Sequence, residues 1–121
     1  MTSAAEMWHA REGAAPTDDI VGFSIEATDG DIGRVAKANA ETGSAYLIVA
    51  TGPWILGRTV MLPAGVIERI DYRAEVVHVN RSKDNIKNAP EYHDERHDDE
   101  TYRGELGGYY GAQRQEPPGA A

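Results

Sequence analysis

Apolar residues alternate with polar or small ones in short runs along residues 18–92, and turn residues separate these runs. The first run places Val21, Phe23 and Ile25 on one side of the backbone, with the period of two that is typical of a strand with one buried face. Similar runs predict strands within residues 31–40, 44–51, 59–63, 66–71 and 75–80. The run at 44–51 is the most continuously apolar, so we predict that it is the central and most buried strand.

Turn and cap residues stand between the predicted elements. Asp29 and Gly30 form a dipeptide that suits a tight hairpin turn, and we expect Gly30 to adopt a positive φ. Gly33 lies inside the return strand, where the absence of a side chain favours a bulge or a close backbone approach. Ser82 is a candidate N-cap for a single helical turn that ends before Pro90.

The predicted strands indicate a mainly β fold. About six short strands at a spacing of roughly 8–12 residues are typical of a sandwich or barrel. In so short a chain, closing the sheet on itself removes its exposed edges. We therefore predict a small β-barrel over residues 18–92, followed by one short helical turn.

The two ends of the chain differ from this domain in composition. Residues 1–17 are rich in Ala and polar residues, and residues 93–121 contain an acidic run followed by Gly and Pro. Such composition predicts mobile tails on either side of the domain. Trp8, Tyr109 and Tyr110 are exceptions, because aromatic residues in a polar tail either dock on a groove or remain exposed.

Four segments together resemble the PRC-barrel domains: VGFSIEATDGDIGRV, AYLIVATGPWILGRTVMLP, VIERIDYRAEVVHVN and SKDNIKNAPEY. This family is named for the cytoplasmic part of the photosynthetic reaction-centre H subunit, and it includes the C-terminal domain of a ribosome-maturation factor. The chain is most similar to small stand-alone bacterial members. The resemblance implies a PRC-type barrel, and the family has no shared catalytic residues to carry over.

Composition narrows the possible partners. The chain has 121 residues, a formal net charge of −8 and no cysteine, which excludes disulfides and cysteine-based zinc sites. An acidic net charge argues against nucleic-acid binding, and the alternative is a local basic patch on the folded surface. The residues that would form this patch are Arg58, Arg69, Arg73, Arg81, Lys83 and Lys87. No segment has the ~20 apolar residues of a membrane span, and no secretory signal is present, so we predict a cytoplasmic protein.

The loop GPWILGR is the predicted protein interface. Trp54, Ile55 and Leu56 are three consecutive large apolar residues, with Arg58 beside them. Loops run on the surface, and Trp is enriched at binding hot spots. The alternative is that Trp54 caps one end of the barrel. A domain of this size buries only roughly 60% of its unfolded surface, which favours a homodimer.

His93 and His97 are the strongest candidates for metal ligands. They are four residues apart and surrounded by carboxylates, so on a helix they would share a face. No apolar helix pattern supports them, and we interpret this run as a solvated acidic segment. Asp29 and Asp31 lack the remaining ligands of a calcium loop, so we interpret them as turn residues. We predict no catalytic residue, no metal and no cofactor.

These observations favour a non-enzymatic adaptor that acts as a homodimer and binds a further protein partner. The first alternative is an RNA- or ribosome-associated assembly module, as the resemblance to the maturation-factor domain suggests. The second is a small metal-binding protein or hydrolase, which would need a pocket of convergent polar groups.

Overall fold

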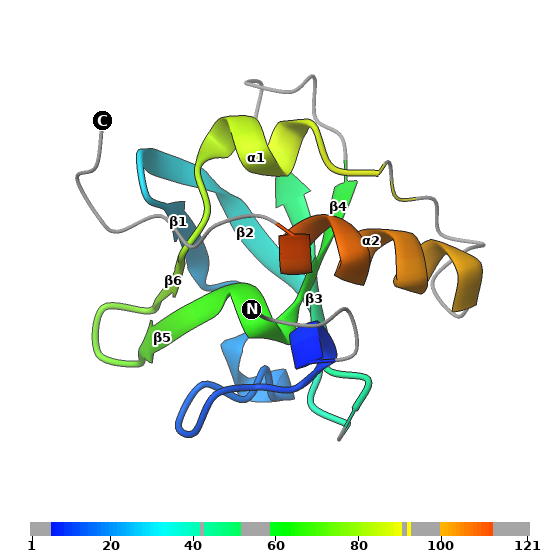
Figure 1. Ribbon diagram of the computed structural model, residues 1–121. Helices are drawn as coiled ribbons and strands as arrows, with labels where there is room; N and C mark the ends of the chain where they lie inside the picture. The colour runs from blue at the N-terminus through cyan, green and yellow to red at the C-terminus, as the bar shows by residue number, and fades with distance from the viewer. Residues whose placement is uncertain (1–5, 42, 52–58, 91, 93–99, 113–121) are drawn as a thin grey trace.

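Six strands form one mixed sheet in the computed structural model, which describes residues 6–41, 43–51, 59–90, 92 and 100–112. The strand order is β4-β3-β2-β1-β6-β5. The strands are β1 (Ser24–Ala27), β2 (Gly30–Asn39), β3 (Tyr46–Thr51), β4 (Thr59–Pro63), β5 (Ile67–Asp71) and β6 (Val76–Val79) (Figure 1). The short elements are η1 (Glu6–Trp8), η2 (Asp18–Ile20), η4 (Ala64–Val66), α1 (Lys83–Lys87) and α2 (Glu100–Ala112).

A parallel contact joins the two halves of the sheet. Strands β1 to β4 form an antiparallel meander, and β5 and β6 form a hairpin. The meander and the hairpin meet where β1 pairs in parallel with β6, with Ile25 opposite Val77. Both side chains are fully buried, so this junction lies in the core.

The predicted mainly β fold and its six strands are confirmed, with two differences in detail. The first strand begins at Ser24 and not at Val21, because Gly22 has a φ of 93° and a turn precedes the strand. The predicted central strand is also misplaced. β3 has three consecutive buried residues, yet it lies second from the edge, while β2 and β1 occupy the middle of the sheet.

The sheet ends at β4 and β5, which do not pair with each other within the described residues. The connection between them is short, because η4 follows β4 directly and leads into β5. The sheet is thus an open, mixed six-stranded sheet, and closure into a barrel stays a prediction.

The glycine in the return strand has the predicted close backbone approach. A Cβ built on Gly33 would lie 2.2 Å from the carbonyl oxygen of Ala50 on β3, and the φ of Gly33 is 141°. The β1–β2 register also shifts beside it, between Ile25 and Glu26, as a bulge requires. Gly33 therefore lets β2 bend while it stays paired to both neighbouring strands.

The expectation of a mobile N-terminal tail is wrong for residues 6–17. Met7 and Trp8 are 2% and 6% exposed and belong to the core. The Trp8 carbonyl accepts a hydrogen bond of 3.0 Å from the backbone N–H of Ala45, just before β3. A Cβ on Gly65 in η4 would lie 2.9 Å from the Cα of Met7, so two backbones pack in direct contact there.

The expectation of a mobile C-terminal tail is wrong for residues 100–112. These residues form α2, which packs against η1 (Figure 1). Tyr102, Leu106 and Tyr110 recur every fourth residue on one helix face, and each is 0–1% exposed. The sequence did not predict this helix, because it contains four glycines and follows a charged run. Glycine has a low intrinsic propensity for the helix. Burial of the apolar face outweighs this local preference.

The predicted cap of α1 is confirmed. The Ser82 hydroxyl accepts a hydrogen bond of 3.2 Å from the backbone N–H of Asn85. Ile86 is the buried residue of this short helix, which ends at Lys87, three residues before Pro90.

Replacing Gly33 with Ala should destabilise the protein much more than replacing Gly22. Both glycines have positive φ, so each substitution carries a backbone cost of about 1–2 kcal/mol. At Gly22 the new Cβ would meet open space, whereas at Gly33 it would collide with the backbone of β3. We expect Gly33→Ala to cost at least about 3 kcal/mol or to prevent folding. Urea denaturation followed by circular dichroism compares the two variants, and equal losses would contradict the close approach.

Replacing Leu106 with Ala tests whether α2 belongs to the core. Leu106 is fully buried, and truncating such a side chain costs about 2–5 kcal/mol of unfolding free energy. The neighbouring Glu105 is exposed, so Glu105→Ala should change stability by less than about 0.5 kcal/mol. Thermal unfolding measures both. An unchanged melting temperature for Leu106→Ala would mean that α2 does not pack against the core in solution.

Candidate functional site

The interface and metal candidates from the sequence lie outside the described residues. Trp54, Ile55, Leu56 and Arg58 fall within residues 52–58, and His93 and His97 fall within residues 93–99. Their proposed roles therefore stay predictions. Among the described residues, no group of three or more His, Asp or Glu side chains is arranged to hold a metal ion.

The predicted turn residues have structural partners. Gly30 has a φ of 140°, as predicted for the hairpin turn. The Asp29 carboxylate accepts a hydrogen bond of 2.9 Å from the backbone N–H of Lys83, the first residue of α1. The Asp31 carboxylate accepts one of the same length from the backbone N–H of Gly33. The two aspartates thus fasten the β1–β2 hairpin and its bulge, which agrees with their interpretation as turn residues.

Four polar residues form a row across the outer face of the sheet. Arg69 on β5 pairs with His78 on β6. His78 in turn pairs with Glu26 on β1, and Glu26 pairs with Asp31 on β2. The His78 Nδ1 lies 3.7 Å from a Glu26 carboxylate oxygen. Long-range pairing of the strands creates this row, and its members are far apart in the sequence.

The outer end of the row carries a second charge pair, on β5 itself. A guanidinium nitrogen of Arg69 lies 3.9 Å from a carboxylate oxygen of Asp71, and both side chains point to the same face because they are two residues apart. The Arg69 side chain is 62% exposed and that of Asp71 is 35% exposed. β5 is therefore an edge strand with one positive and one negative side chain on its outer face.

Two large apolar side chains are exposed near the turn that follows β5. Val21 is 48% exposed and Tyr72 is 49% exposed. The Tyr72 ring meets the ring of Phe23 edge-on at 5.8 Å, and the backbone N–H of Ser24 donates to the carbonyl of Glu75 at 3.0 Å. These contacts bring the chain before β1 and the β5–β6 turn to the same end of the sheet. Apolar surface thus adjoins the edge strand.

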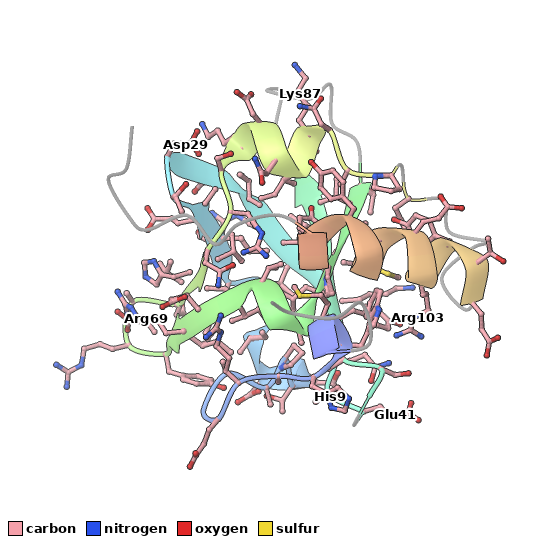
Figure 2. All side chains as sticks on the ribbon, viewed as in Figure 1. His9, Asp29, Glu41, Arg69, Lys87 and Arg103 are labelled. Carbon is pink, nitrogen blue, oxygen red and sulfur yellow. The ribbon has the colours of Figure 1, made fainter. Side chains whose placement is uncertain are left out.

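The candidate basic patch does not form among the described residues. Arg81 is 4% exposed, and its guanidinium donates to the backbone carbonyls of Asn80 and Tyr110 at 3.1 and 2.9 Å. Arg69 and Lys87 lie on widely separated parts of the molecule (Figure 2). Arg81 is therefore a core residue that holds the end of α2, and it is not available to a phosphate.

A second arginine that sequence reasoning did not select fixes the middle of α2. The Arg103 guanidinium lies 4.5 Å from the ring centroid of Trp8 and 5.4 Å from that of Tyr46. It also donates a hydrogen bond of 3.0 Å to the carbonyl of Ser44. Figure 2 shows Arg103 below α2, between the helix and the N-terminal segment. No short motif marks this residue, since its partners come from two separate parts of the chain, the N-terminal segment and the start of β3.

Tyr110 has an unusual environment at the end of α2. Burial raises the pKa of its phenol well above the ordinary value of 10, and the neighbouring tyrosines raise it further. The hydroxyl is buried and has no hydrogen-bond partner among the described residues. Burial also raises the pKa of Tyr109, whose hydroxyl donates to the carbonyl of Asn85 at 2.6 Å. Both tyrosines thus serve to dock α2 on α1 and the core.

No protein-family model matches the chain, and no curated protein matches its sequence. None of the described helices is long and apolar enough to cross a membrane.

Replacing Tyr110 with Phe should remove part of the alkaline instability of the protein. Above pH 10 the unfolded chain releases the phenolic proton of Tyr110 while the folded chain retains it, so the unfolding free energy falls as the pH rises. This residue should contribute about 1.4 kcal/mol per pH unit to that fall. Chemical denaturation between pH 9 and 11 should show a shallower slope for Tyr110→Phe. At pH 7 the variant should lose little stability, because the lost hydroxyl has no described partner. An identical slope would contradict the buried, neutral phenol.

Proposed function

We propose that this chain is a non-enzymatic protein–protein interaction module of the PRC-barrel type, and that it acts as a homodimer. The observation that carries the proposal is the open edge of the sheet at β5, with the exposed side chains of Val21 and Tyr72 close by. An edge strand presents backbone N–H and C=O groups that can pair with another chain.

The two edge strands of the sheet differ in burial. Four of the five residues of β4 are buried, from Val60 to Pro63, and Pro63 has no N–H to donate. Most residues of β5 are instead exposed or half-buried, and only Ile67 is buried. β5 is nevertheless short, has a bulge at Glu68 and carries charged side chains, so the chains that can pair with it are limited to those with a complementary charge pattern.

The loop predicted from Trp54, Ile55 and Leu56 extends the proposal to a further protein partner. Three adjacent large apolar residues beside Arg58 have the composition of a binding hot spot. The net charge of −8 suits a basic partner protein better than a nucleic acid, since like charges repel the phosphate backbone. The burial of Arg81 further weakens the case for an RNA-associated module.

The homodimer is tested by the mass of the protein in solution. Size-exclusion chromatography with light scattering should give about twice the chain mass of 13.2 kDa at micromolar concentration. Dilution should shift the peak toward the monomer, because a small interface gives a reversible dimer. A monomeric mass at every concentration up to the millimolar range would overturn the homodimer.

A further inference from the structure

We propose that β5 pairs with β5 of a second copy of this chain, antiparallel and centred on Ile70, so that the two sheets join at their edges. This inference rests on the proposed homodimer and assigns its contact surface. The loop at Trp54 is then left for a different partner.

The side chains of β5 are divided between its two faces. Arg69 and Asp71 point outward and form the ion pair described above, while Ile70 between them is half-buried and packs against the core. The register of β5 against β6 shifts between Ile67 and Arg69, which places Glu68 in a bulge. The regular part of this edge strand is therefore Arg69 to Asp71, with Ile70 at its centre.

Symmetry limits the ways in which this strand can pair with its own copy. A two-fold axis perpendicular to the sheet keeps the inner faces of both copies on one side and the outer faces on the other. Directly opposed side chains then belong to the same face, so one residue of the strand must lie opposite the same residue of the second copy. Centring the pair on Arg69 or on Asp71 sets two like charges directly opposite each other, which is destabilising. Centring it on Ile70 sets Ile70 against Ile70 and each Arg69 against Asp71 of the other copy.

A pair centred on Ile70 gives favourable contacts on both faces of the strand. On the inner face, the two Ile70 side chains cover the surface that each leaves partly exposed in one copy. On the outer face, the ion pairs within each strand become part of a four-charge cluster with alternating sign. Charge complementarity therefore selects a second copy of this chain as the occupant of the edge, and it also selects the register.

The sharpest test uses a disulfide across the two-fold axis, because the chain has no cysteine of its own. Directly opposed residues have Cα atoms about 4.5–5.5 Å apart, within the range that a disulfide spans. Ile70→Cys should therefore form a covalent dimer under mild oxidation, seen on a non-reducing gel. Tyr72→Cys is the matched control, since the proposed register separates its two copies by about 13 Å. Equal or preferential cross-linking of Tyr72→Cys would overturn the register.

A charge reversal tests the complementarity without a covalent bond. Arg69→Glu puts a carboxylate opposite Asp71 of the other copy, and we expect the dimer dissociation constant to rise at least about tenfold. Lys37→Glu makes the same change in net charge on the exposed surface of β2, away from the edge, and should leave the constant within about twofold of wild type. Analytical ultracentrifugation measures the constants, and thermal unfolding checks that each variant is folded.

The outcomes separate this inference from the proposed homodimer. A wild-type dimer that Arg69→Glu weakens, together with selective cross-linking of Ile70→Cys, supports the β5 contact. A wild-type dimer that Arg69→Glu leaves as tight as before overturns the β5 contact and retains the homodimer. A wild-type monomer at every concentration overturns both.

Discussion

The parallel contact between β1 and β6 is the constraint on which the rest of this structure depends. Every other strand pair joins neighbours in sequence, and each of those pairs would form locally within a meander or a hairpin. The β1–β6 pair instead joins strands at opposite ends of the domain, and it aligns Ile25 with Val77. Without it, the meander and the hairpin would be two separate pieces with no shared core.

The two terminal segments depend on this sheet and complete the core. Met7 and Trp8 pack against η4 and the start of β3, while α2 packs against η1 and buries its Tyr and Leu face. Arg103 and Arg81 hold α2 at its middle and its end through aromatic rings and backbone carbonyls. A domain of this size buries only a limited fraction of its surface, so the terminal segments supply apolar side chains that enlarge the core formed by the strands.

The same architecture explains why one edge of the sheet is accessible. β4 is buried along most of its length, whereas β5 carries an ion pair on its outer face and a half-buried Ile on its inner face. The proposed function and the proposed dimer contact both follow from this asymmetry. The sequence adds a second proposed surface, the loop at Trp54, which we assign to a different protein partner.

The sequence by itself determined the local structure. Short apolar runs between turn residues predicted the six strands, Asp29-Gly30 predicted the hairpin, Gly33 predicted the close backbone approach, and Ser82 predicted the helix cap. Each of these signals acts between residues that are near one another in sequence or through a rule of backbone sterics. This is why they could be recognised without coordinates.

The tertiary structure alone decided the strand order, the burial of Trp8 and α2, and the outer row of Arg69, His78, Glu26 and Asp31. The terminal segments have few apolar residues, and the glycines of α2 hide a helix that is stable only when its face is buried. The role of Arg81 depends on a carbonyl 29 residues away, and that of Arg103 on rings from two other segments. The contacts of these two arginines join distant parts of the chain, so no periodic pattern or short motif in the sequence predicts them.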